Sequence, residues 1–187
     1  MSDDVKPVRA PFDEATARSL RAGDRVLISG TILAARDAAH KRLVESLSRG
    51  EPLPVDLRGQ VIYYVGPSPA SPGHVIGSAG PTTAGRMDAY TPTILACGVR
   101  GMIGKGYRSP EVVEAMKAHG VPYLAAVGGA GALIARCIRK YTVLAYADLG
   151  PEAVAALEVE DFPAIVVIDS LGHNYYEIGQ ALYRQQV

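Results

Sequence analysis

Hydrophobic and polar positions along the chain follow two patterns that alternate with each other. Short apolar runs bounded by glycine or proline predict strands, and these runs are DRVLISGTI, VIYYVG, HVIGSA, VRGMIG, VPYLAAV, YTVLAYA and AIVVIDS. Between them, apolar residues at helical spacing predict helices over residues 13–21, 37–50, 82–97, 109–120, 129–138 and 151–162. This alternation predicts an α/β fold with helices that flank a layered, mixed or largely parallel sheet.

Capping residues mark the ends of two of these predicted helices. Asp37 and Ser109 are expected N-caps, because their side-chain oxygens can accept a hydrogen bond from the first helical turn. Gly50 and Gly120 are expected to end the same two helices, because glycine adopts the left-handed conformation that terminates a helix. Both segments are therefore expected to begin and end cleanly.

Length and charge limit the classes of protein to consider. A chain of 187 residues is long enough to bury a sizeable core, and we expect one domain over residues 1–187. The 19 Lys and Arg residues balance the 19 Asp and Glu residues without a basic block, so no nucleic-acid or membrane surface is predicted. The start has no apolar signal region, and no run is long enough to span a bilayer. We therefore expect a cytoplasmic protein.

Cysteine and histidine positions do not predict a metal site. Cys97 and Cys137 lie far apart in apolar surroundings, as expected for buried free thiols rather than for a disulfide framework or a paired metal motif. The histidines are also scattered along the chain: His40, His74, His119 and His173. No metal is expected to be bound by this chain alone.

Two glycine-rich motifs resemble nucleotide-binding loops but lack required residues. GAGALI begins like a dinucleotide fingerprint, yet Ile134 occupies the third glycine position. VRGMIGKG begins like a phosphate-binding loop, yet Val99 replaces its first glycine and Gly106 its serine or threonine. Lys105 nevertheless lies in a glycine-rich loop after a strand, where its ammonium could reach an anionic ligand.

The stretch GSAGPTTAGRMD is the main candidate for a binding site. A predicted strand ends before Gly80, and Thr82 and Thr83 come at the expected start of the next helix. Exposed N–H groups and the helix dipole at such a start favour a carboxylate. Arg86 lies four residues after Thr82, so its guanidinium can project beside the same helix end and bind a carboxylate with two hydrogen bonds.

Arg36 and Lys105 lie on two further loops that follow predicted strands. Loops at strand ends gather ligands in α/β folds, so Arg36, Arg86 and Lys105 could converge on one small anion. Two alternatives remain open at this point. Arg36 and Arg86 could simply cap helices or pair with Asp37 and Asp88, and Thr82 or Thr83 could only be an N-cap.

Several segments resemble one enzyme family. These are GTILAARDAAHKRL, VGPSP, GSAGPTTAGRMDAYTP, MIGKGYRSPEV and LEVEDFPAIVVID, and they resemble the β subunit, or C-terminal domain, of class I iron–sulfur fumarases and tartrate dehydratases. The resemblance covers most of the chain, and GPTTAGRMD is its most specific part. It implies a swivelling β/β/α domain and a [4Fe–4S] cluster bound by three cysteines of a separate α subunit or N-terminal domain.

The resemblance also implies roles for individual residues. Arg36 and Arg86 match arginines that bind the dicarboxylate, Lys105 matches a substrate-binding lysine, and Thr82 matches a threonine proposed to transfer a proton. Thr83 is expected to join the substrate-binding group. His40 and Asp88 are nearby titratable residues whose roles are left open between chemistry and structure.

The implied function is that of the β subunit of a two-subunit hydro-lyase. The cluster of the α partner would act as Lewis acid on the leaving hydroxyl, while this chain would bind the carboxylates of fumarate or malate. Alternatives are an L(+)-tartrate dehydratase or mesaconate-type subunit, and a stand-alone anion-binding or regulatory module. We expect a hetero-oligomer, αβ or α2β2, and an apolar, glycine-rich surface around the site that the partner covers and through which the isolated chain could self-associate.

Overall fold

The computed structural model describes residues 5–184 of the chain. These residues form seven strands: β1 (Val5–Ala10), β2 (Arg25–Ala34), β3 (Val61–Tyr63), β4 (Gly101–Gly104), β5 (Tyr123–Ala125), β6 (Ile138–Ala145) and β7 (Val154–Ile168). The α-helices are α1 (Glu14–Ser19), α2 (Asp37–Ser48), α3 (Thr91–Ala96), α4 (Pro110–His119), α5 (Gly131–Ala135) and α6 (Tyr175–Tyr183). Two 3₁₀ helices, η1 (Ala84–Met87) and η2 (Ala147–Glu152), complete the secondary structure of the described part of the chain.

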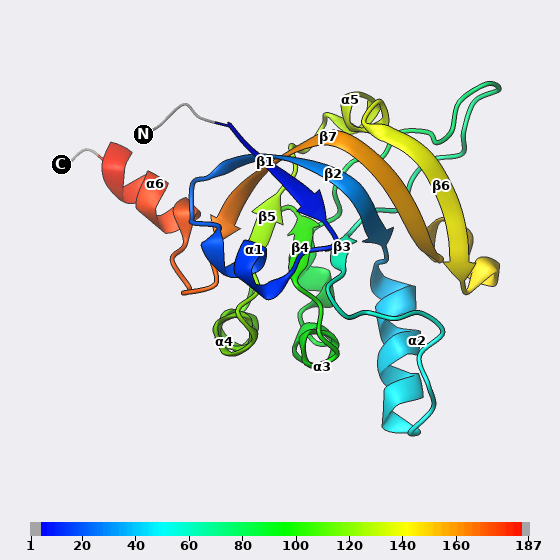
Figure 1. Ribbon diagram of the computed structural model, residues 1–187, viewed down its shortest axis with the longest axis horizontal. Helices are drawn as coiled ribbons and strands as arrows, with labels where there is room; N and C mark the ends of the chain where they lie inside the picture. The colour runs from blue at the N-terminus through cyan, green and yellow to red at the C-terminus, as the bar shows by residue number, and fades with distance from the viewer. Residues whose placement is uncertain (1–4, 185–187) are drawn as a thin grey trace.

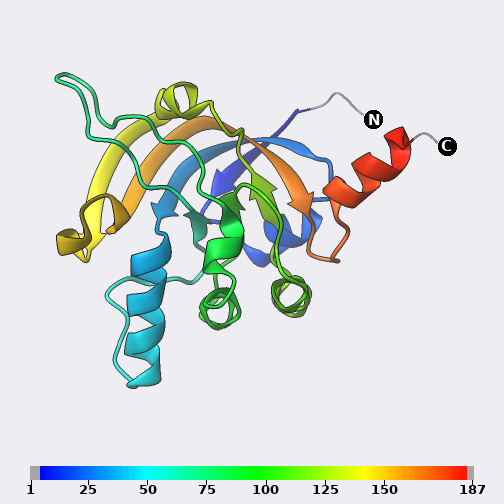
Figure 2. The ribbon, with the colours of Figure 1, turned by 180° about the vertical axis from the view of Figure 1, so that it is seen from behind.

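Five strands close on themselves to form a small barrel-like sheet. β2, β3, β4 and β5 run parallel in that order, and β7 pairs antiparallel with both β5 and β2. β1 and β6 extend the sheet outside this ring, on β2 and β7 respectively (Figures 1 and 2). The prediction of an α/β fold with a mixed sheet and flanking helices is therefore confirmed.

The long strands β2 and β7 bend where their pairing changes register. Gly30 has a φ of 113°, and a Cβ at this position would collide with the backbone oxygen of Ala10. Opposite it, Asp161 has a φ of 50°, and its N–H donates to the Ser29 hydroxyl at 3.0 Å. A bulge of this kind increases local twist, which lets two long strands wrap around a narrow barrel.

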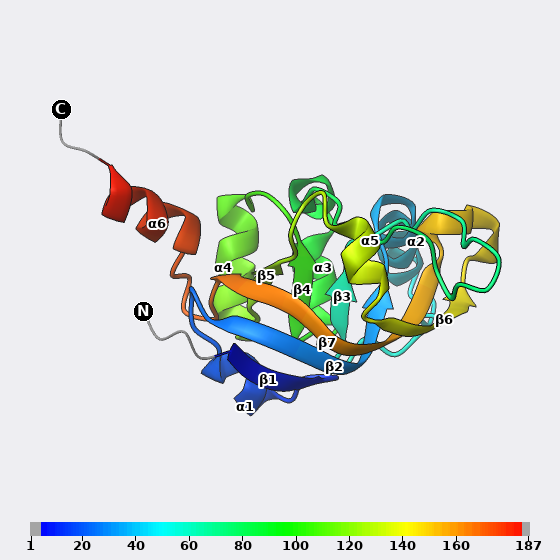
Figure 3. The same cartoon turned by 90° about the horizontal axis from the view of Figure 1, so that it is seen from above.

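Alternating side chains of the strands build a core on both faces of the sheet. On β3, Val61 and Tyr63 belong to the cluster inside the barrel, whereas Ile62 between them belongs to the cluster beneath the helices. Leu43 of α2 and Met116 of α4 are fully buried in this second cluster. Helices α2, α3 and α4 accordingly cover one side of the sheet, as Figure 3 shows. These helices begin in the loops that carry the site residues.

Most predicted elements are present, usually shorter than expected. The strands predicted over residues 24–32, 61–66, 99–104, 121–127 and 141–147 correspond to β2 to β6. Ser109 caps α4 by accepting from the Val112 N–H, and Gly120 ends the helix with a φ of 67°, so both of these predictions are confirmed. The strand β1 and the helix α6 were not predicted.

The helix predicted over residues 151–162 is wrong, because most of this segment belongs to strand β7. Its side chains alternate in exposure: Leu157 and Val159 are buried, and Glu158 and Glu160 are exposed. β7 pairs with β2 on one side and with β6 on the other. Pairing on both edges outweighs the helix propensity of its alanine and glutamate residues.

Three further predictions are also wrong. Residues 74–79 form no strand but one arm of a loop, whose arms are joined by a hydrogen bond of 3.0 Å from the Ser68 N–H to the Ser78 oxygen. The helix predicted over residues 82–97 is split into η1 and α3. Arg36, not Asp37, occupies the N-cap of α2, so Asp37 is the first residue of that helix.

Within residues 5–184, every helix is too short or too polar to cross a lipid bilayer.

Candidate functional site

The predicted site residues lie at one edge of the sheet, on loops that follow neighbouring parallel strands. Arg36 follows β2, the segment from Thr82 to Arg86 follows β3 after a long loop, and Lys105 directly follows β4. Because β2, β3 and β4 are adjacent and parallel, their carboxyl ends meet at the same edge. In open α/β sheets, this edge is where ligands bind.

Backbone hydrogen bonds place Thr82 and Thr83 between the extensions of β3 and β4. The Thr82 N–H donates to the backbone oxygen of Tyr64 at 2.7 Å, and the Lys105 N–H donates to the backbone oxygen of Thr82 at 3.2 Å. Thr83 and Lys105 form a parallel bridge. The structure therefore brings Thr82, Thr83 and Lys105 together and fixes their backbones.

Neither threonine caps an α-helix, so two sequence-based interpretations are corrected. Thr83 occupies the N-cap of η1, a 3₁₀ helix of four residues, and makes no side-chain cap hydrogen bond. Thr82 precedes it in an extended segment. The glycine and proline residues of this stretch favour such a turn over a continuous helix. In the described part of the chain, the Thr82 hydroxyl takes part in no hydrogen bond, and Thr82 is half-buried.

Arg36 and Arg86 meet at the carboxylate of Asp37. Nε of Arg86 donates to one carboxylate oxygen of Asp37 at 2.8 Å, and Nε of Arg36 lies 3.4 Å from the other. The two arginines therefore lie side by side, and the pairing of Arg36 with Asp37, one of the alternatives left open, is observed. The alternative that Arg86 pairs with Asp88 is wrong, because Asp88 contacts Arg108 and accepts from the Ser109 N–H instead.

Glu152 is a further member of this group that the sequence did not reveal. Its carboxylate accepts from Nη2 of Arg36 at 2.8 Å and from the backbone N–H of Ala38, in the first turn of α2, at 3.0 Å. The residue belongs to η2, at the turn between β6 and β7. The erroneous helix prediction over residues 151–162 concealed this turn.

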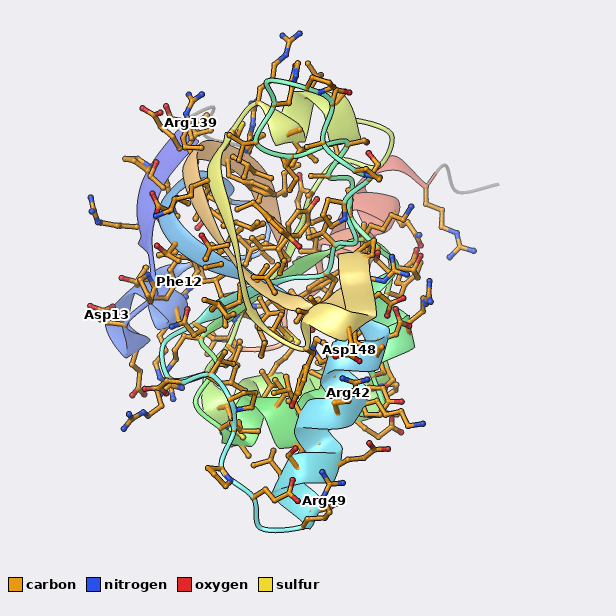
Figure 4. The ribbon with its side chains drawn as sticks, turned by 90° about the vertical axis from the view of Figure 1, so that its right-hand side faces the viewer. Phe12, Asp13, Arg42, Arg49, Arg139 and Asp148 are labelled. Atoms are coloured by element: carbon orange, nitrogen blue, oxygen red, sulfur yellow. The ribbon has the colours of Figure 1, made fainter. Side chains whose placement is uncertain are left out.

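η2 is fixed to α2 by a second arginine–carboxylate pair. Arg42 of α2 donates two hydrogen bonds, of 2.9 and 2.6 Å, to the carboxylate of Asp148. Figure 4 shows the two side chains facing each other where the turn between β6 and β7 meets the helix. This contact holds the turn that carries Glu152 against the helix that Arg36 precedes.

Arg108 forms a buried polar centre beneath the site, and it too was missed. Its guanidinium Nε lies 2.9 Å from the carboxylate of Asp88, and its side chain is fully shielded from solvent. Nη1 donates to the Tyr64 hydroxyl at 3.1 Å, and Nη2 donates to the Thr91 hydroxyl at 2.6 Å. The guanidinium also stacks on the rings of Tyr64 and Tyr123, each 5.3 Å away. Arg108 thereby ties η1 and α3 to the end of β3.

His40 is fully buried on the first turns of α2. Its Nδ1 donates to the Arg36 oxygen at 3.0 Å, and its ring meets the edge of Tyr64 with centroids 5.4 Å apart. Burial away from water lowers the pKa of His40 from 6.5 to about 4, against a smaller opposing effect of the hydrogen bond to Arg36. His40 is therefore neutral near pH 7 and supports the loop that carries Arg36.

The low pKa of His40 predicts a loss of stability in acid. Because the folded-state pKa of about 4 lies below the ordinary 6.5, the unfolded chain binds this proton more tightly than the folded chain does. The free energy of unfolding should be unaffected by this group above pH 6.5, and should fall by about 3 kcal/mol as the pH drops from 6.5 to 4. Urea denaturation across this range measures the change.

The control for this measurement is His74, which is exposed on the long loop. His40→Gln should flatten the dependence of stability on pH between 6.5 and 4, whereas His74→Gln should leave it as in the unmodified chain. Equal pH profiles for all three proteins would contradict a neutral, buried His40.

The Lys105 ammonium lies in an exposed, open part of the site. Among residues 5–184, no carboxylate lies within ion-pair distance of it, and its stem packs over Gly128, where an added Cβ would lie 3.6 Å from its Cδ. Val127 and Leu133, on the loop after β5 and on α5, are 61% and 62% exposed. The exposed Val127 therefore lies next to Gly128, over which the stem of Lys105 packs. That the charged groups of Arg36, Arg86 and Lys105 face one cleft remains a prediction.

The cysteines are free thiols, only half-buried rather than buried as expected. Partial burial raises the pKa of both Cys97 and Cys137. In the described part of the chain, no three His, Cys, Asp or Glu side chains are grouped so that they could hold a metal ion.

Comparison with known proteins identifies the family. The family described as Fumarase C-terminus matches residues 4–179, which is nearly the whole chain. The chain belongs to this family. Its predicted resemblance to class I fumarases and tartrate dehydratases is thereby confirmed.

Relatives of this Fumarase C-terminus chain include fumarate hydratases and a dehydratase subunit. Fumarate hydratase 2 of Leishmania major is 45% identical over 156 residues, which are 82% of this chain and 28% of the relative. The aerobic class I fumarate hydratase of Escherichia coli K12 is 42% identical over 155 residues, 82% of this chain and 28% of the relative. The chain thus spans less than a third of the length of these two fumarate hydratases.

A third relative of the Fumarase C-terminus chain has a comparable length. It is the putative L(+)-tartrate dehydratase subunit beta of Methanocaldococcus jannaschii, 40% identical over 166 residues. The match covers 86% of this chain and 85% of the relative. The same domain therefore occurs both as part of a long chain and as a separate subunit.

Proposed function

We propose that this chain is the carboxylate-binding subunit of a two-subunit iron–sulfur hydro-lyase that interconverts fumarate and malate. The single observation that carries this proposal is the pairing of Arg36 and Arg86 through Asp37. Both ion pairs use the Nε edge of the guanidinium, so the terminal nitrogens of Arg86 stay available for a ligand carboxylate. Arginine binds a carboxylate best through such pairs of parallel hydrogen bonds.

The remaining residues of the site receive complementary roles. Lys105 would bind the second carboxylate of the substrate, since its ammonium is exposed and Gly128 leaves room beside its stem. Thr82 would carry the proton that leaves or joins the carbon next to a carboxylate, because its backbone is fixed on both sides and its hydroxyl is not used for capping. Thr83, exposed beside it, would contact the substrate. The chain thus binds and orients the dicarboxylate and holds a proton at Oγ1 of Thr82.

The iron–sulfur cluster would belong to a separate α subunit. This chain has two cysteines, one fewer than the three thiolates that the family's cluster requires. They lie at the C-terminal end of α3 and just before β6 rather than together. The similarity in length to a dehydratase β subunit supports a hetero-oligomer, αβ or α2β2, and the exposed Val127 and Leu133 offer a surface for the partner. We also propose that the chain folds as a swivelling β/β/α domain and that the protein is cytoplasmic.

Fumarate is the substrate that we propose first. The stretch GPTTAGRMD resembles the fumarase form of the motif, and two of the relatives described above are fumarate hydratases. The subunit-sized relative is a putative tartrate dehydratase, so L(+)-tartrate is the second candidate.

Direct binding measurements test the proposed site. Isothermal titration of the full chain with fumarate, L-malate and L(+)-tartrate should show binding, with propionate as a weaker monocarboxylate control. Arg36→Ala and Arg86→Ala should each weaken dicarboxylate binding by about 10- to 100-fold, because each removes charge-assisted hydrogen bonds. Arg58→Ala, at an exposed arginine paired with Asp56, should bind like the unmodified chain. Equal affinities for the three variants would contradict the proposed site.

A further inference from the structure

The carboxylate of Asp37 lies between two positively charged guanidinium groups. Its Oδ1 accepts from Nε of Arg86 at 2.8 Å, and its Oδ2 lies 3.4 Å from Nε of Arg36. The Asp37 side chain is 27% exposed, so it is partly withdrawn from water. Two arginines brought side by side repel each other, and a shared carboxylate offsets this repulsion where screening by water is reduced.

The guanidinium atoms that contact Asp37 matter as much as the contacts themselves. Asp37 uses the Nε edges, and within the described residues the terminal nitrogens of Arg86 bind no carboxylate. Nη2 of Arg36 donates to Glu152 at 2.8 Å, while Nη1 lies against Gly66, where an added Cβ would be 2.5 Å away. On Arg86, a carboxylate that merely filled the place of a ligand would be expected at the terminal nitrogens, which form the fork that matches a carboxylate.

The position of Asp37 at the start of α2 suggests a simpler role, stabilisation of the helix. An experiment must distinguish this role from an effect of Asp37 on the two arginines. As the first residue of α2, its negative charge stabilises the helix dipole wherever its side chain points. A glutamate at this position would keep that charge at the helix start. Its longer side chain would not keep both oxygens between the same two Nε atoms.

We propose that Asp37 is a positioning residue that holds Arg36 and Arg86 side by side, so that the terminal nitrogens of Arg86 and Nη1 of Arg36 form one carboxylate site. This inference rests on the proposed function, because it assigns the arginines a carboxylate ligand. Glu152 supports the arrangement from the other side by holding Nη2 of Arg36 against the first turn of α2. Asp37 itself touches no substrate.

Titration of full-chain variants with fumarate and L-malate tests the proposal. Asp37→Asn and Asp37→Glu should each weaken dicarboxylate binding by about 10-fold, a loss comparable to that of one charged hydrogen bond. In the Arg86→Ala background, Asp37→Asn should have an effect at least about threefold smaller than in the unmodified chain, because residues that act through each other are not additive. Asp56→Asn removes the same charge from another arginine-paired aspartate and should leave binding unchanged.

Three results would overturn the proposal. Tighter binding by Asp37→Asn would show that the carboxylate competes with the ligand, and normal binding by Asp37→Glu would show that only the helix dipole matters. An additive effect of Asp37→Asn and Arg86→Ala would show that the two residues act separately.

A measurement without ligand keeps this inference distinct from the proposed function. In ¹H–¹⁵N spectra of arginine side chains, the Nε–H of Arg86 should be protected from exchange in the unmodified chain and exchange faster in Asp37→Asn. Unchanged exchange would overturn the inference even where dicarboxylates bind. If exchange changes but neither the unmodified chain nor Arg86→Ala binds a dicarboxylate, the positioning of Arg86 by Asp37 holds and the proposed function fails.

Discussion

Replacing Arg108 with methionine is expected to lower the free energy of unfolding by about 3–5 kcal/mol, the usual cost of removing one partner from a buried ion pair. The guanidinium is fully shielded and contacts Asp88, Tyr64 and Thr91 at once. Methionine fills much of the same volume but removes the positive charge beside the Asp88 carboxylate and one hydrogen bond from each of the Tyr64 and Thr91 hydroxyls. Each buried polar group left unpaired adds to the cost.

Urea denaturation measures this loss, with Arg42→Met as the matched control. Arg42 also binds an aspartate with two hydrogen bonds, but its side chain is 39% exposed and that of Asp148 is 63% exposed. An exposed pair contributes at most about 1 kcal/mol. A loss of less than 1 kcal/mol for Arg108→Met, or equal losses for the two variants, would contradict the description of Arg108 as a buried centre beneath the site.

Replacing Thr82 with alanine should lower kcat of the assembled enzyme by roughly 10²- to 10⁴-fold, the usual contribution of a positioned proton-transfer group. The change removes a hydroxyl that caps no helix, while the backbone of Thr82 remains bound to Tyr64 and Lys105. Because the carboxylates would be held by other residues, KM should change little, and kcat and kcat/KM should fall together.

Steady-state hydration kinetics and melting temperatures should be measured on the same samples of this variant. Thr93→Ala, at an exposed threonine of α3, is the control and should show normal turnover. A normal kcat for Thr82→Ala, with only a lowered melting temperature, would assign the threonine a structural role. A steep rise of KM at constant kcat would instead assign it to substrate binding.

The order of strands and helices could be predicted from the sequence because most elements carry their own local signals. The cap, first-turn proline and terminal glycine of α4 are all local features, and all appear as predicted. Once the order was known, the strand-end positions of Arg36 and Lys105 followed from the rule that parallel strands gather ligands at their carboxyl ends.

The parts that could not be predicted depend on contacts between distant segments. The sequence around Glu158 favours a helix locally, yet pairing with β2 and β6 makes it a strand, and Glu152 was hidden in the same segment. Its contact with Arg36 joins residues 116 positions apart, which no local pattern reveals. Arg108 stands just before a correctly predicted helix, but its burial depends on α3 and β3 packing around it.

The break within the segment 82–97 was, by contrast, available from the sequence. Gly85 and Pro92 both interrupt this segment, and such residues weaken or end a helix. Applied there, this rule would have separated η1 from α3. It would also have placed Thr82 and Thr83 in an extended strand-end segment rather than at the start of an α-helix.

The central claim is that this chain supplies one half of a shared active site. Anaerobic hydration of fumarate should therefore be measured with this chain alone, with a cluster-bearing α subunit alone, and with the two combined. We predict activity only in the combined sample, and its loss when the combined sample contains Arg86→Ala. Full activity of the α subunit alone, or no activity of the combined, cluster-loaded proteins toward fumarate, L-malate or L(+)-tartrate, would contradict the account.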